Sequence, residues 1–173
     1  MEREASGSKE CAALPERQPG KVDEGTAMGE RLTLRTLDLA DYERWMSVWQ
    51  RAGLHSLRSN GRDSRQALAR QLATGTHTVI GLERAGELIG AVLATHDGRK
   101  GWINRLAVLP EYRRRGYAAR LVEAAETVLR EQGMTVIAVL IEPGNGGSLA
   151  LFRGLGYEEM RVHYLTKRDS EDA

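Results

Sequence analysis

The sequence NRLAVLPEYRRRGYA at residues 104–118 reads as a β-strand, a short loop rich in arginine, and the opening turns of an amphipathic helix. The first backbone N–H groups of a helix have no partner inside it, and the aligned peptide dipoles place roughly half a positive charge there. Gly116 removes a side chain from this turn, and Ala118 and Ala119 keep the next positions narrow. The stretch therefore predicts a site where a phosphate group touches backbone nitrogen.

Three nucleotide-binding motifs use such a turn, and two of them do not match. A P-loop needs Gly-Lys-Ser/Thr, whereas Tyr117 and two alanines follow Gly116. A dinucleotide fingerprint needs Gly-x-Gly-x-x-Gly directly after the strand, and this window contains one glycine. The third pattern, Arg/Gln-x-x-Gly-x-Gly/Ala, is matched by Arg113, Gly116 and Ala118.

In this pattern the chain resembles the GCN5-related N-acetyltransferase superfamily. A second block, NGGSLALFRGLGY at residues 145–157, is similar to the family's later segment Asn-x-x-Ala/Ser-x-x-Leu-Tyr-x-x-x-Gly-Phe/Tyr. The two blocks stand in the family's order, separated by one helix and one apolar strand. The resemblance implies a single-domain α/β fold of the acyl-CoA N-acyltransferase type, with a mixed, mostly antiparallel sheet, splayed central strands and flanking helices.

The arginine run at residues 113–115 also fits a solvated surface or a nucleic-acid patch. Lys and Arg number 25 against 24 Asp and Glu, so the net charge of +1 provides no global field to attract a polyanion. The four histidines lie in different predicted elements and show no ligand spacing. We expect neither nucleic acid nor a metal ion as a partner.

The chain of 173 residues, 41% apolar, fits one domain at residues 28–173. Residues 1–27 contain almost no periodic apolar residue, and we expect a flexible leader there, with Met28 as a candidate translation start. No apolar run approaches the ~20 residues that cross a bilayer. Cys11 is the only cysteine, so no internal disulfide can form and a cytoplasmic location is expected.

Hydrophobic periodicity and turn residues divide the rest of the chain into helices and strands. The helix that begins after Asp38 or Asp41 carries Trp45 and Trp49 at helical spacing, which favours a core position over an aromatic substrate box. The apolar run at 136–141 is typical of a strand buried on both faces. The expected strands are 31–36, 78–84, 87–96, 101–108, 136–141 and one within 157–166, and the expected helices end before Gly53, begin after Ser64, and span 115–132 and 148–155.

The resemblance assigns cofactor-binding roles along these two blocks. The pantetheine arm would pair with the strand at Leu106, Ala107 and Val108, and the thioester carbonyl would meet a backbone N–H near Val108. Asn145 and Ser148 would bond the same arm or cap the last helix. The pyrophosphate site would comprise Arg113, Arg114, Arg115, Gly116, Tyr117, Ala118 and Ala119.

The acid and base are less well defined by sequence. Many family members carry a tyrosine that protonates the departing thiolate, and the matching residue here is Phe152, which has no proton to give. The task would pass to water, Tyr157 or Tyr164. Glu142 is the candidate relay for the amine proton, or else an exposed carboxylate at a strand end. Such a site favours an α-amine of pKa ~7.8 or a small-molecule amine over lysine at ~10.4.

The sequence thus predicts an acetyl-CoA-dependent N-acetyltransferase that moves acetyl directly to a primary amine of a small molecule, peptide or protein. The alternative is a non-catalytic acyl-CoA-binding regulatory module. The final strand is shorter than the family's usual closing pair, so a homodimer in which a second subunit covers the sheet edge is also expected.

Overall fold

The structure, a computed structural model, describes residues 31–169, so the expected leader and Cys11 lie outside the described residues. Short 3-10 turns, Leu39–Asp41 and Pro110–Tyr112, precede α1 and α3. The main elements, in chain order, are β1 Leu32–Leu37, α1 Tyr42–Arg51, α2 Arg65–Ala73, β2 His77–Arg84, β3 Glu87–His96, β4 Gly101–Val108, α3 Tyr117–Glu131, β5 Ile137–Val139 and α4 Gly146–Gly154.

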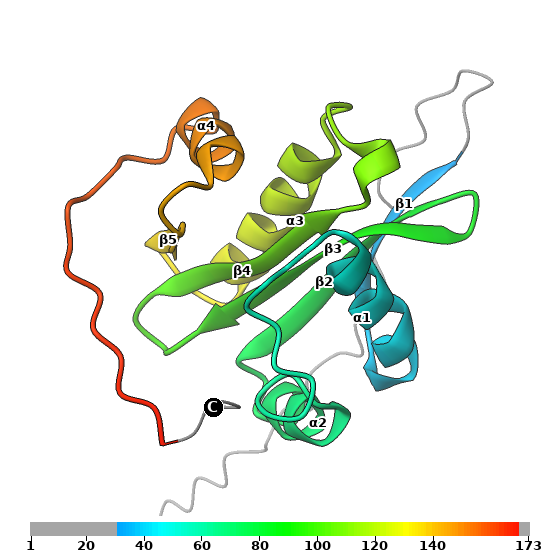
Figure 1. The fold of residues 1–173 in the computed structure, drawn as a ribbon, viewed down its shortest axis with the longest axis horizontal. Coiled ribbons are helices and arrows are strands. Elements are labelled where there is room, and N and C mark those ends of the chain that lie inside the picture. Colours follow the sequence, from blue (N-terminus) through cyan, green and yellow to red (C-terminus); the bar gives the residue numbers. More distant parts are fainter. Residues whose placement is uncertain (1–30, 170–173) are drawn as a thin grey trace, which may run out of the picture.

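The strands form one sheet in the order β1-β2-β3-β4-β5 (Figure 1). The first three pairings are antiparallel, and β4 and β5 are parallel because α3 carries the chain back to the start of the sheet. The sheet is therefore mixed and mostly antiparallel, as expected. The boundaries of β3 and β4 match the sequence prediction at both ends.

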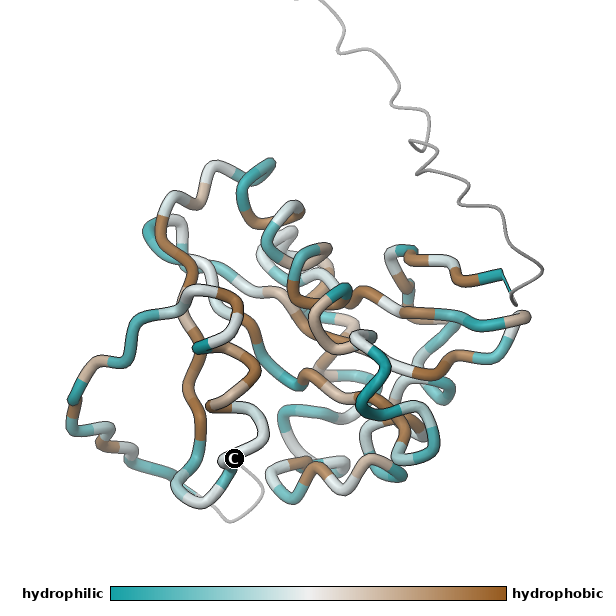
Figure 2. The backbone as a smooth tube through the Cα atoms, turned by 90° about the horizontal axis from the view of Figure 1, so that it is seen from above, coloured by the Kyte–Doolittle hydropathy of each residue, from teal (hydrophilic) through white to brown (hydrophobic). Residues whose placement is uncertain are grey.

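Helices cover both faces of the sheet and create two apolar clusters. On one face, Trp45 and Trp49 of α1 are fully buried with their ring centroids 6.3 Å apart, which confirms the prediction that they belong to the core. On the other face, α3 buries Leu121, Val122 and Leu129 against the sheet. Figure 2 shows apolar residues along the strands in the middle of the fold and hydrophilic residues on the outer turns.

A glycine allows α3 to approach the sheet closely. A Cβ atom at Gly90 of β3 would lie 3.0 Å from the carbonyl oxygen of Ala107 and 2.9 Å from a methyl group of Leu121. The backbone oxygen cannot move out of the way without breaking the β3–β4 ladder. Gly90 therefore allows Leu121 of α3 to pack directly onto β3, the strand beside the one that carries the candidate site.

Two expectations about the end of the chain are wrong. The strand at β5 is half-buried and three residues long, with Val136 and Leu140 about half exposed on either side of it. Residues 158–169, hereafter the C-terminal segment, are exposed and form neither helix nor strand, so the strand expected within 157–166 is absent. An apolar run is buried on both faces only where both faces are covered, and here residues 136–141 line an open hollow.

The helices between residues 31 and 169 are all too short or too polar to cross a bilayer.

Candidate functional site

A β-bulge divides β4 into two halves. Leu93 pairs with Asn104 and Ala91 pairs with Ala107, so Arg105 and Leu106 together lie opposite the one residue between Ala91 and Leu93. Arg105 adopts a left-handed conformation with φ +53°, which is unusual for a residue with a side chain. A bulge bends its strand and increases the local twist. The ladder between β4 and β5 contains three pairs and ends at Ile103, so the second half of β4 continues without β5 beside it.

The backbone N–H of Val108 faces the side where β4 has no neighbouring strand in the described part of the chain. Leu109 N–H donates to the carbonyl of Ile89 at 2.9 Å, so Leu109 is a hydrogen-bonded position of the β3–β4 ladder. Such positions alternate along an antiparallel pair, and Val108 must therefore point its N–H away from β3. The break between β4 and β5 thus contains a backbone donor at the position that the sequence prediction gave to the thioester carbonyl.

Arg113 fastens the end of β4 to the end of α1. Its Nε donates to the carbonyl oxygen of Val108 at 3.1 Å, and its Nη2 donates to the carbonyl oxygen of Ala52 at 2.8 Å. The guanidinium therefore holds the loop before α3 in place. The side chain of this predicted cofactor-binding residue is engaged with the protein's own backbone.

The turn before α3 leaves its first amides available. Gly116 is the residue before the helix, with φ +80° and no side-chain cap, and Arg114 is also left-handed at φ +62°. The first helical bond runs from Arg120 N–H to Gly116 O at 3.2 Å, so the N–H groups of Tyr117, Ala118 and Ala119 precede it. A Cβ atom at Gly116 would meet no atom within 4 Å, so the space beside the Cα atom of Gly116 is open.

A hollow of about 1800 Å³ lies between β5, α4, the loop after α1 and the C-terminal segment. Its lining brings together four predicted site residues, which are Glu142, Asn145, Phe152 and Tyr164. Glu142 is exposed, two residues beyond Leu140. Asn145 accepts the Ser148 N–H at 3.1 Å through Oδ1, so Asn145 caps α4 in this structure. Among residues 31–169, no His, Cys, Asp or Glu cluster of three or more has the arrangement of a metal site.

The two tyrosines considered as acids have different surroundings. The phenol of Tyr157 donates to Glu126 Oε1 at 2.7 Å, and its ring packs edge-on against the buried Phe152 at 5.0 Å. Burial, followed by this hydrogen bond, raises the pKa of Tyr157 well above its ordinary value. A phenol held in this way is a poor proton donor. Tyr164 lies on the C-terminal segment and is 70% exposed.

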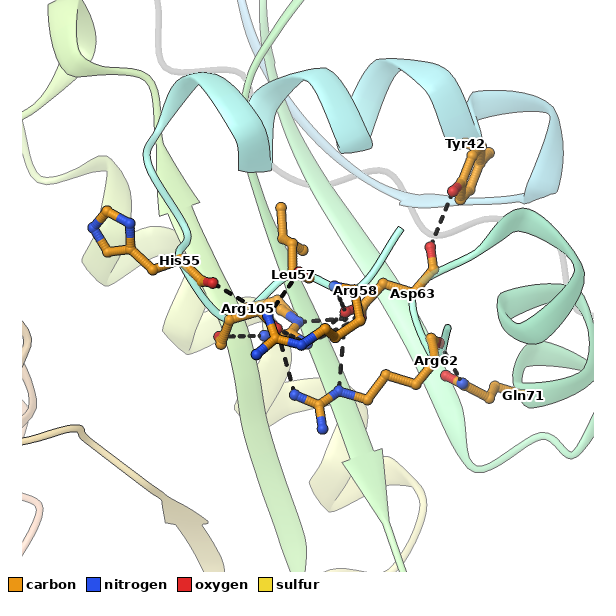
Figure 3. A network of polar contacts seen from close by, with 9 residues as sticks. Tyr42, His55, Leu57, Arg58, Arg62, Asp63, Gln71 and Arg105 are labelled. Atoms are coloured by element: carbon orange, nitrogen blue, oxygen red, sulfur yellow. Dashed lines mark hydrogen bonds and ion pairs between the residues drawn. The ribbon is translucent and has the colours of Figure 1, made fainter. Parts of the chain in front are cut away.

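A buried ion pair that the sequence did not reveal lies next to the bulge (Figure 3). Arg105 Nη2 donates to Asp63 Oδ2 at 2.7 Å and to Oδ1 at 3.0 Å, and its Nη1 donates to Ser56 Oγ at 2.6 Å. Asp63 also accepts the backbone N–H of Arg58 at 2.8 Å, and its carbonyl accepts the Tyr42 hydroxyl at 3.0 Å. These bonds attach the α1–α2 loop, residues 52–64, to the bulge of β4.

No local sequence signal could have revealed this pair. Asp63 and Arg105 are 42 residues apart along the chain. The sequence predicted only that a helix begins after Ser64, and Ser64 does cap α2, because its Oγ accepts the N–H of Ala67 at 3.2 Å.

The comparison with known families identifies the class. A family model described as the acetyltransferase (GNAT) family matches residues 35–157, which is most of the chain. The chain belongs to this family, and the resemblance drawn from its two motifs is confirmed.

Solved structures of acetyltransferases share the fold. The aminoglycoside N-acetyltransferase AAC(6')-Iy, in complex with a bisubstrate analogue, is 22% identical with a TM-score of 0.67, over 80% of this chain and 99% of that one. The PaiA N-acetyltransferase from Thermoplasma acidophilum, in complex with coenzyme A, is 17% identical with a TM-score of 0.68, over 77% and 93%. AAC(6')-IG from Acinetobacter haemolyticus is 22% identical with a TM-score of 0.65, over 80% and 99%.

Proposed function

We propose that this protein is an acetyl-CoA-dependent N-acetyltransferase that transfers acetyl directly to a primary amine. The observation that carries this proposal is the break between β4 and β5, where the N–H of Val108 faces the side without a neighbouring strand in the described part of the chain. The first amides of α3 follow nine residues after Val108. A thioester and a pyrophosphate of one coenzyme would need these two donor sets. The donor for the thioester comes first along the chain and the donors for the pyrophosphate follow, which is the order that the resemblance to the family implies.

In this proposal, backbone groups make most of the contacts with the coenzyme. The N–H groups from Arg114 to Ala119 bind the pyrophosphate, helped by the positive end of the α3 dipole. Leu106, Ala107 and Val108 align the pantetheine arm along the half of β4 that has no strand beside it. The Val108 N–H donates to the thioester oxygen as negative charge develops on it, an effect worth about 3 kcal/mol per donor.

Side chains in and beside the hollow would transfer the protons and position the pantetheine arm. Glu142 accepts the amine proton through water, and Tyr164 protonates the departing thiolate in place of the tyrosine that Phe152 replaces. Asn145 and Ser148, at the start of α4, also contact the arm, and Phe152 forms part of the wall. An α-amine or a small-molecule amine is the preferred acceptor, because it loses its proton more easily than lysine near neutral pH.

The protein is further proposed to act in the cytoplasm as a homodimer. Cys11 is the only cysteine in the sequence, which fits a reducing compartment. Within residues 31–169, no strand lies beside the outer edge of β5, and a second subunit would cover it.

Two measurements test the proposed reaction. Acetyl-CoA at 100 times its dissociation constant should stabilise the protein by about 2.7 kcal/mol, which a thermal-shift assay detects. Free-thiol release should then depend on both enzyme and amine in a screen over α-amines, polyamines and lysine peptides. A regulatory module would bind acetyl-CoA and release no thiol with any amine. If acetyl-CoA produces no thermal shift, the proposal is wrong.

A further inference from the structure

One histidine, which no motif of the sequence pointed to, lines the hollow. All four histidines of the chain lie within the described residues, and His55 is the one that belongs to the lining. The Nδ1 atoms of His77 and His96 are each engaged in a hydrogen bond with a group one or two residues away. His163 lies on the C-terminal segment and does not line the hollow. His55 therefore shares the hollow with Glu142 and Tyr164, the two side chains to which we assign proton transfer.

The imidazole of His55 is available to a molecule in the hollow. The residue is exposed, and within residues 31–169 no hydrogen bond or ion pair engages either ring nitrogen. Its carbonyl oxygen accepts Arg58 Nη1 at 3.5 Å, and Figure 3 shows the ring directed away from Arg58 and Arg105. Imidazole is in general a stronger base than a carboxylate, with an ordinary pKa of about 6.5 against about 4.3.

The loop that carries His55 is anchored to β4 at the very next residue. Arg105 Nη1 donates to Ser56 Oγ at 2.6 Å, and Arg105 Nη2 donates to the Ser56 carbonyl oxygen at 3.2 Å. The ion pair with the buried Asp63 holds the same guanidinium in place. A catalytic side chain needs such support from the residues around it. The position of His55 relative to the β4 bulge is thus set by contacts of its neighbour, and the ring itself stays free.

The spacing between this anchor and the proposed thioester donor suits a base. Arg105 precedes Val108 by three residues, which is about 10 Å along a strand. A base on the amine nitrogen and a donor on the thioester oxygen stand on the order of 8 Å apart, because each contact is one hydrogen bond long and the reacting carbon lies between them. One small substrate can therefore touch both the imidazole and the Val108 N–H.

We infer that His55 is a catalytic base of the acetyl transfer. The inference rests on the proposed function and adds a second proton acceptor to it. An amine that enters as an ammonium ion loses two protons before it becomes an amide. Glu142 takes the first of them through water, and His55 takes the second.

The proton inventory of this step is closed. After the first proton has left, the electron pair of the amine nitrogen forms the C–N bond with the thioester carbon. The nitrogen of the adduct then gives its second proton to His55. The C–S bond breaks with its electron pair on sulfur, and Tyr164 protonates the thiolate. His55 and Glu142 return their protons to solvent, from which Tyr164 regains one.

Replacement of His55 in the full chain tests the inference. His55→Gln should lower kcat about 100-fold with the amine that gives the fastest thiol release in the screen, because an amide cannot accept the proton. The melting temperature and the thermal shift with acetyl-CoA should not change, since the ring is exposed. The matched control is His163→Gln, which removes an exposed imidazole outside the hollow and should leave kcat unchanged.

Added imidazole separates proton transfer from any other role of the ring. His55→Ala leaves space for imidazole from solution, which should raise kcat in proportion to its concentration. Ser56→Ala removes the bond from Arg105 and keeps His55, so kcat should fall about tenfold through misplacement of the base, and imidazole should not restore it. A natural kcat in His55→Gln, or a His55→Ala variant that imidazole fails to restore, would overturn the inference.

The same measurements distinguish this inference from the proposed reaction. If the natural protein releases thiol with an amine and the His55 variants do so equally well, the reaction stands and the role of His55 is refuted. If the natural protein binds acetyl-CoA and releases no thiol with any amine, the reaction is refuted, and the role of His55 with it.

Discussion

Arg105 and Asp63 form a buried ion pair in which one guanidinium nitrogen, Nη2, lies 2.7 and 3.0 Å from the two carboxylate oxygens. The pair joins the left-handed residue of the β4 bulge to the loop that follows α1. A non-glycine residue in this conformation costs roughly 1–2 kcal/mol, so the surrounding contacts must hold it there. The bulge follows directly after the last paired residues of the β4–β5 ladder, Ile103 and Val139. The ion pair therefore stabilises the break at which we propose the thioester binds.

Asp63→Asn should destabilise the fold strongly. The change leaves Arg105 without its counter-charge at a site where the two side chains are 12% and 5% exposed, and breaking a buried pair in this way costs about 3–5 kcal/mol. Chemical denaturation measures the loss. The control is Glu111→Gln, which breaks an exposed pair with Arg51 and should cost at most about 1 kcal/mol. Equal losses in the two variants would mean that the pair does not hold the loop.

Gly116→Asn should abolish the thermal shift with acetyl-CoA and leave a folded protein. Asparagine tolerates a positive φ better than other residues with a side chain, and its side chain would occupy the open space in front of the α3 amides. Gly98→Asn is the matched control, because Gly98 has φ +81° and an equally open surrounding in the turn between β3 and β4. A full thermal shift in the Gly116 variant would place the coenzyme elsewhere.

Tyr157→Phe should lower stability without changing kcat, and Tyr164→Phe should lower kcat without changing stability. Loss of the Tyr157 hydroxyl removes its bond to Glu126 and should lower stability by about 1 kcal/mol, with kcat unchanged. Loss of the Tyr164 hydroxyl should lower kcat about tenfold, less than the ~100-fold of a strong general acid, because a thiol of pKa ~8.5 already departs as an anion. Stability should not change, since Tyr164 is exposed. Steady-state thiol release and urea unfolding separate the two effects, and the reverse pattern would assign the proton to Tyr157.

The loss of folding stability at acidic pH should depend on Asp41. The hydrogen bond from Arg35 holds the pKa of Asp41 well below its ordinary value, with Arg44 adding to the effect. A carboxyl whose pKa is lowered by folding contributes stability above its unfolded pKa of ~3.9, and this contribution is lost as the pH falls below that value. Asp41→Asn should therefore be clearly less stable than the natural protein at pH 7, and the difference should shrink at pH 3. Urea unfolding at both pH values checks this, and a difference that grows with acid would contradict it.

Local sequence patterns predicted most of the fold, because they reflect interactions between residues that are close together along the chain. The apolar run of β3, the cap at Ser64 and the apolar stripe of α3 each depend on neighbours a few residues away. The turn at Gly116 and the motif around it were predicted for the same reason.

What the sequence could not reveal depends on partners distant along the chain. The bulge at Arg105 needs a left-handed residue that no motif signals, and its partner Asp63 comes from another element. The apolar run around β5 predicted a central strand, because such a run records apolar character and not the number of neighbouring strands. The last expected strand was wrong for a related reason: alternating apolar residues are present in the C-terminal segment, but alternation does not determine whether a segment pairs with a sheet edge, and here the segment stays exposed.

The two bonds of Arg113 have a mechanical consequence. Its guanidinium donates to the carbonyl oxygens of both Val108 and Ala52. A shift at the end of α1 would therefore also displace the peptide next to the proposed thioester site. The end of α1 and the strand that would carry the donor are thus joined through a single side chain. A displacement of the end of α1 would consequently change the alignment of the Val108 peptide.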